Sequence, residues 1–401
     1  MIGEHLKVLL VEDSDDDAEL LRIALLHTGF HVERVDKLAT ALKQLSTATY
    51  DVVLLDMSLP DSRGFATFSR VHTLVPHLPI IVLTGLDDEV LGLKTVQEGA
   101  QDYLVKGDAG TALLVRAIRY AVERKRAEEL TAGFLEQLRV KNTQMQDDLR
   151  LAREVQEAFL PQHYPSFPPL SFSHRYSPAG IVGGDLFDVS RLSADLAGIL
   201  ICDVMGHGVR AALVTGMLRA LIGEHPPAAH HPEQMLAELN RGLRTILKTT
   251  DTPMFCSAFY LVVNAATGEV AWSNAGHPSP LRVRANGGPV EPLQGPNDPR
   301  GPVLGLFDAP SYTAQRCTLD RGDRILCFTD GVYEVDPEGG GDCYGQVRLR
   351  AAVAQRAGLP REEFLDGLLA ELRAYSGSEH FADDACLLAM DFKRSPDPVT
   401  Q

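Results

Sequence analysis

The sequence predicts an open doubly wound α/β domain with a parallel sheet, then a long helix, then a second domain that mixes strands and helices. Over the first ~110 residues, short continuous apolar runs alternate with amphipathic stretches, as in parallel strands covered on both faces by helices. Between Thr111 and Phe159 there is no proline and only one glycine, Gly133, so this segment predicts one long helix or two. Beyond it, strand-like and helical segments are mixed up to about Lys393.

The composition is that of an ordinary globular protein and excludes several classes. The chain has 401 residues, enough for two domains, and a formal net charge of −16. So acidic a chain is not expected to bind nucleic acid or an anionic membrane. The six cysteines form no C-x-x-C pair, which indicates neither a disulfide framework nor a zinc cage. Because no run of about 18 apolar residues and no apolar signal core is present, we expect no membrane partner and a cytoplasmic location.

The chain is expected to divide into four parts: residues 1–122, a helical linker over 123–160, a second domain over 161–394, and a flexible tail over 395–401. In the first part the parallel strands are expected at Val8–Val11, Val52–Leu55, Ile80–Leu83 and Tyr103–Val105, with helices such as Ala18–Leu26 and Leu38–Leu45 between them. In the second domain, strands are expected at Leu196–Cys202, Ser257–Val263 and Arg324–Phe328, helices at Val209–Ile222 and Pro232–Leu247, and a loop at Asn286–Gly305.

Polar side chains follow the apolar runs of the first domain. They are Glu12, Asp13, Asp56, Thr84 and Lys106. Because the carboxyl ends of parallel strands meet at one edge of the sheet, these groups are expected to converge there. Three carboxylates repel one another unless a cation lies among them, and oxygen ligands favour Mg²⁺. A lysine and a hydroxyl nearby provide what the oxygens of a phosphoryl group need, and a carboxylate can itself accept that group.

The segments V-L-L-V-E-D, L-L-D-M-S-L-P-D-S-R-G, I-V-L-T-G and D-Y-L-V-K-G resemble a response-regulator receiver domain over residues 5–126. The resemblance implies that a sensor histidine kinase supplies a phosphoryl group to Asp56. It implies Asp13 and Asp56 as Mg²⁺ ligands with Glu12 helping through water, contacts from Thr84 and Lys106 to the phosphoryl group, and Tyr103 as the switch aromatic. One departure is Gly107, where many receivers have proline. The alternatives are ordinary acids at a sheet edge, or a degenerate receiver that accepts no phosphate.

The linker fits a heptad frame, with Leu135, Asn142, Leu149 and Gln156 at the a positions and Leu138, Met145, Ala152 and Phe159 at the d positions. An asparagine at an a position sets the register of parallel dimers at some cost in stability. We therefore expect a coiled-coil homodimer through this helix, against the alternative of a single helix packed on its neighbours.

In the second domain, aspartates accompany glycines at the ends of expected strands. The set comprises Asp185, Asp188, Asp203, Asp330, Asp383 and Asp384. Several aspartates without histidine or cysteine partners favour Mg²⁺ or Mn²⁺ over zinc, and two such ions can act on a phosphoryl group. No serine or cysteine lies in a recognisable triad, so water is the expected attacking group.

The segments G-G-D-L-F-D, D-V-M-G-H-G, S-N-A-G-H-P-S-P, F-T-D-G-V-Y-E and A-D-D-A-C-L-L resemble the metal-dependent type 2C protein phosphatases, in the sporulation-protein-E branch, over residues 150–393. The stretch A-R-E-V-Q-E-A-F-L-P is similar to the helix that precedes the catalytic domain of that branch. The resemblance implies a four-layer α+β fold, a β-sandwich flanked by helices. It implies two Mn²⁺ or Mg²⁺ ions between the sheets, with Asp185, Asp203, Asp330 and Asp383 as catalytic ligands, the Val204 carbonyl as a further ligand, and Asp188 and Asp384 in the surrounding shell.

Some residues depart from this family pattern or invite other interpretations. Cys386 replaces the usual hydroxyl residue after the last acidic pair, and no arginine can be identified that must hold the substrate phosphate. G-G-D-L-F superficially resembles the loop of diguanylate cyclases, but Leu186 stands at the position of the catalytic glutamate and D-V-M-G-H-G stays unexplained. His207 and His277 are interpreted as structural hydrogen-bonding residues, with a catalytic role as the alternative.

Taken together, the two resemblances predict a response regulator whose output is protein phosphatase activity controlled by phosphorylation of Asp56. The implied substrate is phosphoserine or phosphothreonine on a protein, and anti-sigma factor antagonists are the usual targets of this branch. The alternative is a catalytically silent scaffold that binds a regulatory partner in response to phosphorylation. The filled set of aspartates favours the enzyme.

Overall fold

The computed structural model describes residues 5–26, 28–85, 89–107, 110–223, 227–248, 253–295, 300–338 and 340–393. The predicted tail, 395–401, lies outside these ranges. The chain divides between Thr143 and Gln144 into two compact units, which are described separately. Among the described residues, no helix combines the length and the apolar character needed to cross a bilayer.

The first unit contains a five-stranded parallel sheet, as predicted, with strand order β2-β1-β3-β6-β7. The strands are β1 (Lys7–Val11), β2 (His31–Val35), β3 (Val52–Asp56), β6 (Ile80–Thr84) and β7 (Asp102–Val105). The helices are α1 (Asp15–Leu25), α2 (Leu38–Leu45), α3 (Phe65–Leu74), α4 (Glu89–Gln97) and the start of α5, and two short strands, β4 (Ser58–Leu59) and β5 (Ser62–Arg63), form a hairpin after β3.

Alternate residues of the central strands feed two separate cores, one on each face of this sheet. Leu9, Val53 and Val82 pack with residues of α2 and α3. Leu10, Leu54 and Ile81 pack with residues of α1 and α5. Because side chains alternate along a strand, continuous apolar runs fill both faces, which is why the doubly wound prediction holds. The carboxyl ends of β1, β3, β6 and β7 are thereby fixed at one edge.

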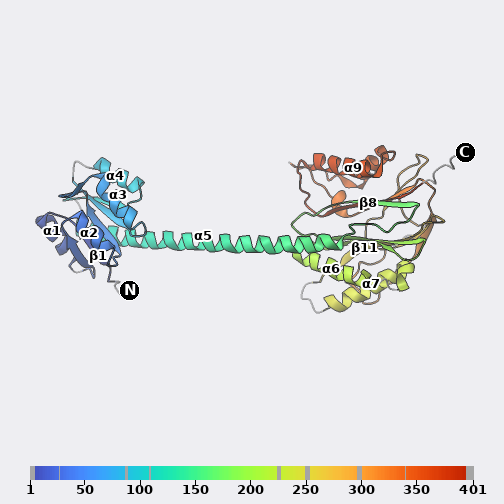
Figure 1. The fold of residues 1–401 in the computed structure, drawn as a ribbon, viewed down its shortest axis with the longest axis horizontal. Coiled ribbons are helices and arrows are strands. Elements are labelled where there is room, and N and C mark those ends of the chain that lie inside the picture. The colour runs from blue at the N-terminus through green and yellow to red at the C-terminus, as the bar shows by residue number, and fades with distance from the viewer. Residues whose placement is uncertain are drawn as a thin grey trace. The chain divides into compact units, whose positions relative to one another are not determined.

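Helix α5 (Thr111–Phe159) is one continuous helix of 49 residues (Figure 1). Its first turns belong to the first unit, where Leu114, Ile118 and Val122 are buried. From Glu123 to Asp148 nearly every side chain is exposed. Its last turns belong to the second unit, where Gln156 is buried. The helix therefore has an apolar stripe at its start, where it completes the receiver-like core, and a polar exterior over most of its length.

The second unit contains two five-stranded antiparallel sheets, with orders β15-β12-β11-β10-β9 and β14-β13-β16-β17-β8. The first sheet comprises β9 (Asp185–Arg191), β10 (Leu196–Val204), β11 (Cys256–Asn264), β12 (Glu269–Ala275) and β15 (Gln315–Thr318). The second comprises β8 (Leu170–Ser177), β13 (Leu281–Val283), β14 (Glu291–Pro292), β16 (Arg324–Phe328) and β17 (Ala385–Phe392). Strand β14 interrupts the segment expected to be loop, Asn286–Gly305.

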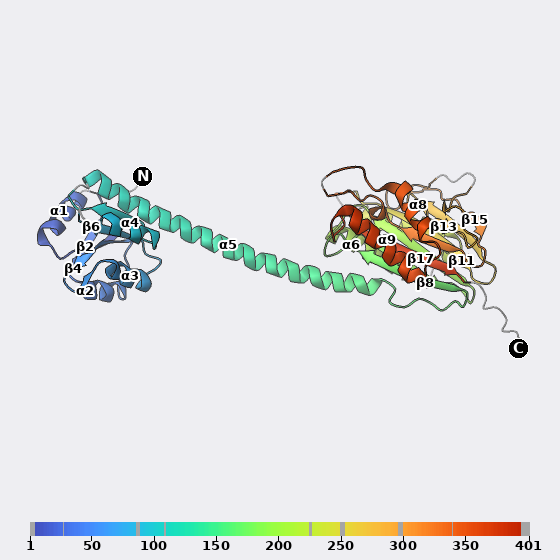
Figure 2. The ribbon, with the colours of Figure 1, turned by 90° about the horizontal axis from the view of Figure 1, so that it is seen from above.

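Helices cover the outer face of each sheet, which confirms the predicted four-layer sandwich. On the first sheet lie α6 (Val209–Gly223) and α7 (Pro232–Leu247), preceded by the short helix η1 (Pro227–His230). On the second lie α8 (Gly345–Gln355) and α9 (Arg361–Ser376). Figure 1 shows α9 and α7 on opposite sides of the strands, and Figure 2 shows α9 over β17 and β8. Trp272 and Phe259 are fully buried in the larger core, which includes the inner faces of both sheets.

Candidate functional site

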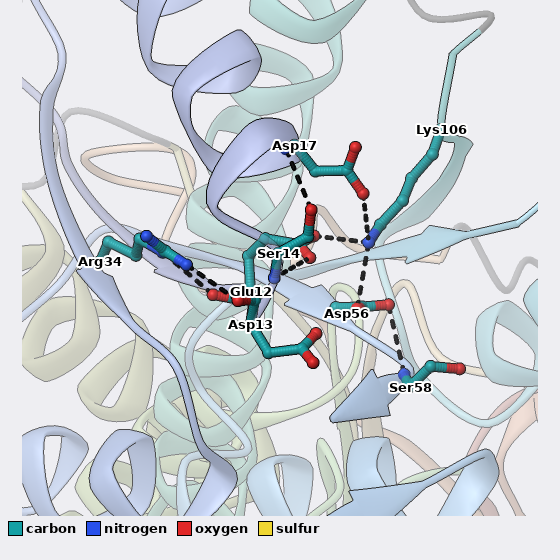
Figure 3. Close-up of polar contacts among 8 residues, drawn as sticks. All are labelled: Glu12, Asp13, Ser14, Asp17, Arg34, Asp56, Ser58 and Lys106. Carbon is teal, nitrogen blue, oxygen red and sulfur yellow. Dashed lines mark hydrogen bonds and ion pairs between the residues drawn. The ribbon is translucent and has the colours of Figure 1, made fainter. Parts of the chain in front are cut away.

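Three carboxylates converge at the edge of the parallel sheet. Glu12 and Asp13 follow β1, and Asp56 is the last residue of β3. One ligand oxygen from each of the three lies within 4.8 Å of those of the other two. Figure 3 shows these three side chains near one another. Glu12 is fully buried and Asp56 is nearly so, whereas Asp13 is exposed. The sequence argument predicted this convergence, and the arrangement of hard oxygen donors around an open edge fits a divalent cation.

Lys106, which follows β7, reaches into this acidic cluster. Its Nζ lies 2.6 Å from Glu12 Oε2 and 3.0 Å from Asp56 Oδ2. Burial disfavours the charged ammonium, but the hydrogen bond to Glu12 and the charge of Asp56 outweigh it, so the pKa of Lys106 is raised. Burial also raises the pKa of Glu12, against the hydrogen bond from Lys106. A charged lysine beside Asp56 is suited to contact phosphoryl oxygens there.

Three further residues shape this pocket and were not singled out from the sequence. Asp17 Oδ2 lies 3.3 Å from Lys106 Nζ, as a third carboxylate around the same ammonium (Figure 3). Ser14 caps α1, because its hydroxyl accepts from the Asp17 amide at 3.2 Å while its own amide donates to Glu12. Arg34 of β2 donates to the carbonyls of Glu12 and Asp13 at 3.0 and 3.1 Å. The run S-D-D-D after V-E-D is the N-cap signal that could have identified Ser14.

Thr84 and Tyr103 occupy neighbouring strands at the same side of the sheet. Thr84 ends β6 and is 1% exposed, and its hydroxyl has no hydrogen-bond partner among the described residues. Tyr103 of β7 lies against α4, where a Cβ on Gly92 would be 2.6 Å from the tyrosine Cδ2. The Thr84 hydroxyl therefore has no partner within the described part of the chain, and the Tyr103 ring is in close contact with α4.

The second set of acids lies where the two antiparallel sheets meet. Asp185 begins β9 and Asp203 lies near the end of β10, and the two are paired in register, so their side chains share one face of that sheet. Asp330 begins the short helix η2 (Asp330–Val332) after β16, and Asp383 precedes β17, so both come from the second sheet. Asp185 is buried, Asp203 and Asp330 are half-buried, and Asp383 is exposed.

These four carboxylates act on one another electrostatically. Burial, followed by the charges of Asp330 and Asp383, raises the pKa of Asp203 to about 7. Burial, followed by the charge of Asp203, raises the pKa of Asp185 well above its usual range. The structure therefore brings the predicted acids into one cluster. Their oxygens are less tightly grouped than at the first site, because among the described residues only Glu12, Asp13 and Asp56 place three ligand atoms within 4.8 Å.

Two features show that this cluster suits a hard cation. Asp185 Oδ2 accepts a 2.7 Å hydrogen bond from Thr329, but its Oδ1 is buried and has no hydrogen-bond partner among the described residues. At Gly184, a Cβ would lie 2.8 Å from the Val204 carbonyl oxygen, so only glycine lets these two backbone segments approach this closely. A buried oxygen without a partner beside several carboxylates is costly unless a cation binds it.

Asp384 and Asp188 were both predicted to surround the metal ligands. The structure places Asp384 next to them and Asp188 on the opposite face of the strand. Asp384 accepts from the amides of Ala179 and Gly184 at 2.7 and 2.5 Å, which fixes the residue preceding Asp185. Asp188, by contrast, lies on the opposite face of β9 because it is three residues from Asp185. There it forms a 2.6 Å ion pair with Arg219 of α6. Asp188 is therefore better described as an anchor for α6, which corrects the predicted placement.

Gln156 ties the end of α5 to the cluster. Its amide nitrogen donates to the Gly183 carbonyl at 2.6 Å and to Thr215 of α6 at 3.2 Å, and its amide oxygen accepts from the Gly183 amide at 3.0 Å. Phe159, the last residue of α5, packs against Gly216 of α6. The heptad frame assigned both residues to a dimer seam, and the structure corrects that assignment. A buried glutamine that satisfies backbone groups is committed to its own unit.

The two histidines differ. His277 is fully buried, its Nδ1 lies 2.7 Å from the Ser257 hydroxyl, and burial lowers its pKa to about 3. Its backbone exchanges hydrogen bonds with the Asn274 side chain. His207 is exposed in the turn after β10. Cys386 is buried, and its amide donates to Thr329, the residue that holds Asp185. His277 is thus a neutral structural residue, as interpreted from the sequence.

The fold and the two clusters define a receiver domain followed by a type 2C-like phosphatase domain. The family Stage II sporulation protein E matches residues 193–393, and the family response regulator receiver domain matches residues 8–118. The chain belongs to the Stage II sporulation protein E family, and its N-terminal domain is a response-regulator receiver.

Individual relatives agree with this division. The chain is 26% identical over 247 residues to the phosphoserine phosphatase RsbP of Bacillus subtilis. The aligned region covers 61% of this chain and 58% of that protein. The chain is 27% identical over 197 residues to RsbU of the same species, covering 49% and 56%. It therefore spans less than two thirds of each of these relatives. The solved SiaA PP2C domain of Pseudomonas aeruginosa superposes with a TM-score of 0.55 at 25% identity, covering 64% of this chain and 99% of that one.

Proposed function

We propose that this chain is a metal-dependent protein phosphatase, acting on phosphoserine or phosphothreonine and controlled by its receiver domain. The observation that carries the proposal has two parts. The charges of Asp330 and Asp383 act on Asp203, which itself acts on Asp185, so acids from both sheets come together, and Asp185 Oδ1 is buried without a hydrogen-bond partner among the described residues. An acidic cluster of this kind repels a phosphate monoester. It therefore favours hydrolysis of such an ester only when cations are present.

The chain's own residues supply the metal-binding groups. Asp203 would hold both of two Mn²⁺ or Mg²⁺ ions, with help from the Val204 carbonyl. Asp330 and Asp383 would hold one of these ions, and Asp185 would hold the other through water. Cations in such a centre lower the pKa of bound water and neutralise phosphoryl oxygens. Thr329 orients Asp185, and Asp384 fixes the adjoining backbone at Gly184. Both contacts reduce the freedom of the ligands, which preorganises the centre.

In the receiver, we propose that Asp56 is the phosphoryl acceptor. Glu12, Asp13 and Asp56 would hold Mg²⁺, while Lys106 and the unengaged Thr84 hydroxyl would contact the phosphoryl oxygens, with Tyr103 as the switch aromatic. A sensor histidine kinase is the proposed donor. Phosphorylation would bias the receiver between two states, and α5 would carry that bias to the phosphatase domain through a physical contact.

We further propose that α5 pairs two copies of the chain as a parallel coiled coil. Leu135, Leu138 and Met145 are 62%, 63% and 57% exposed, which is unusual for apolar side chains at heptad spacing unless a partner covers them. The proposed seam ends before Gln156, which is committed to the phosphatase unit.

The proposed substrate is a phosphorylated anti-sigma factor antagonist, and the proposed location is the cytoplasm. The support for this substrate is the similarity to RsbP and RsbU, whose names describe phosphoserine phosphatases. The proposed division places the receiver in residues 1–122, the helical linker in 123–160 and the phosphatase domain in 161–394.

Hydrolysis of a phosphoserine peptide tests the enzyme. We expect activity with Mn²⁺ that chelator abolishes and that Asp203→Asn reduces by about a thousandfold or more, while Asp195→Asn, an exposed control on the same domain, retains it. A wild-type protein that binds a partner but hydrolyses nothing would support the scaffold instead. Comparing rates with and without Asp56 phosphorylation tests the regulation separately, and equal rates would remove only that part.

A further inference from the structure

A small cavity of about 190 Å³ lies on the second sheet of the phosphatase domain, beside the segment that carries Asp330. Its lining includes the polar side chains Ser279, Gln294, Arg300, Gln346 and Arg350, with Phe328 as part of its wall. Phe328 is the last residue of β16, two residues before Asp330. This cavity is too small for a drug-sized molecule and large enough for one charged group.

Two arginines line this cavity, and no acid among the described residues forms an ion pair with them. Arg300 and Arg350 are exposed, and neither forms an ion pair with any carboxylate in the described part of the chain. Among the described residues, the Arg350 side chain makes a long hydrogen bond, 3.4 Å from its Nε to the Gln346 carbonyl. In a chain with a net charge of −16, two guanidinium groups on one cavity that pair with no described carboxylate are a local exception. Guanidinium groups recognise carboxylate and phosphate oxygens well.

A buried hydroxyl in the same cavity independently indicates a ligand. Ser279 is 6% exposed, and its Oγ has no hydrogen-bond partner among the described residues. Such groups are rare in folded proteins because burial without a hydrogen bond is costly. An oxygen-bearing ligand in the cavity would accept from this hydroxyl and from the arginines at once.

The cavity is also connected to the proposed metal centre. Gln346 follows Gly345, whose amide donates to the Tyr333 carbonyl at 2.8 Å, and the charge of Arg300 acts on both Tyr333 and His277. The backbone amide of Tyr333 donates to the Asp330 carbonyl at 2.9 Å. An anion held at the arginines would therefore lie close to, but outside, the cluster of aspartates.

We propose that this cavity binds an anionic side chain of the protein substrate, near the phosphorylated residue. The inference rests on the proposed phosphatase function. It names the substrate class as peptides with an acidic group close to the phosphoserine, either a carboxylate or a second phosphate. The two arginines also explain how so acidic a domain attracts an acidic substrate, because they provide the complementary charge.

Direct binding tests the proposal without relying on turnover. The probes are peptides in which a non-hydrolysable phosphonate replaces the phosphoserine, flanked by glutamate, by a second phosphonate or by glutamine, titrated against the full chain with Mg²⁺. We expect the flanked anionic peptides to bind about tenfold more tightly than the glutamine peptide. Arg300→Gln and Arg350→Gln should each remove most of that difference, whereas Arg241→Gln, an exposed arginine on α7, should not.

The Ser279→Ala variant separates a binding role from a structural one. Removing an unpartnered buried hydroxyl should leave the thermal unfolding midpoint unchanged or higher, while the preference for anionic peptides falls. Equal binding of all three peptides, equal loss in Arg241→Gln, or competition by inorganic phosphate that leaves the peptide preference unchanged would overturn the proposal. Absence of Mn²⁺-dependent hydrolysis of a small chromogenic phosphoester would instead count against the metal centre.

Discussion

Thr329 donates a 2.7 Å hydrogen bond to Asp185, and this bond joins the two sheets of the phosphatase domain at the proposed metal centre. Thr329 follows β16 of one sheet, and Asp185 begins β9 of the other. The same hydroxyl accepts from the Cys386 amide at 2.9 Å. The fully buried Thr329 side chain therefore fixes the proposed ligand Asp185 and joins the end of β16 to the start of β17.

The hydroxyl of Thr329 is expected to support both stability and metal binding. Thr329→Val keeps the shape but leaves Asp185 without its donor, so the free energy of unfolding should fall by about 1–3 kcal/mol. Urea unfolding in chelator measures this change. Thr329→Ser keeps the hydroxyl and should lose much less. A valine variant as stable as wild type would show that the bond contributes nothing.

Asp203 is expected to lower the stability of the folded protein in the absence of metal. Burial and the charges of its neighbours disfavour its ionised form, so Asp203→Asn should raise the stability of the metal-free protein by about 2 kcal/mol near neutral pH. The same variant should lose phosphatase activity. Asp195→Asn, on the exposed surface, should change neither quantity. A less stable Asp203→Asn protein in chelator would argue against a crowded, repelling cluster.

Asp17 is expected to compete with Asp56 for Lys106. Its carboxylate lies 3.3 Å from the ammonium, against 3.0 Å for Asp56. With Asp17→Asn, the ammonium is freer to stay on the phosphoryl group, so phosphorylated Asp56 should persist about two- to fivefold longer, in keeping with a partly exposed ion pair. Intact mass after treatment with acetyl phosphate and Mg²⁺ follows the decay.

Two variants control this experiment. Asp16→Asn removes an exposed neighbouring charge and should leave the lifetime unchanged. Asp56→Asn should never gain the phosphate. A lifetime for Asp17→Asn that matches wild type would show that Lys106 is not shared in this way.

His277 is expected to make the phosphatase domain sensitive to acid. Its pKa is about 3 in the folded chain, against an ordinary value of 6.5. Because the folded pKa is depressed, the stabilisation is complete above pH 6.5 and is lost as the pH falls toward 3, by about 1.4 kcal/mol for each pH unit. Urea unfolding at several pH values should show a shallower acid loss in His277→Gln than in wild type or in the exposed control His163→Gln. Parallel curves for all three would refute a buried, neutral His277.

Much of the fold could be predicted because its signals are local. Val52–Leu55 and Ile80–Leu83 are continuous apolar runs and lie in β3 and β6, and Arg324–Phe328 matches β16. The strand β2 was not predicted, because H-V-E-R-V has one fully buried residue at the sheet edge and carries too many polar side chains to give an apolar run. The predicted loop at Asn286–Gly305 contains the two-residue strand β14, which is too short to leave a periodic signal.

The sites show the same division between local and long-range information. Polar side chains that follow apolar runs predicted the first cluster, and aspartates next to glycines at strand ends predicted the second, since strand ends fix where those side chains go. The structure differs from the expectation for Asp188 because residues three apart on a strand lie on opposite faces. It differs for Gln156 because helical periodicity does not distinguish a dimer seam from an intramolecular contact. The contact of Asp17 with Lys106 and the place of Arg300 in its cavity depend on segments far apart along the chain, and one sequence carries no signal for them.

The measurement that tests the central claim most directly is anomalous X-ray scattering from crystals of the full chain grown with Mn²⁺. We expect anomalous density among Asp185, Asp203, Asp330 and Asp383, next to the Asp185 oxygen that has no hydrogen-bond partner among the described residues, and its disappearance in Asp203→Asn. Crystals grown with Mn²⁺ that show no density between these side chains would contradict the account.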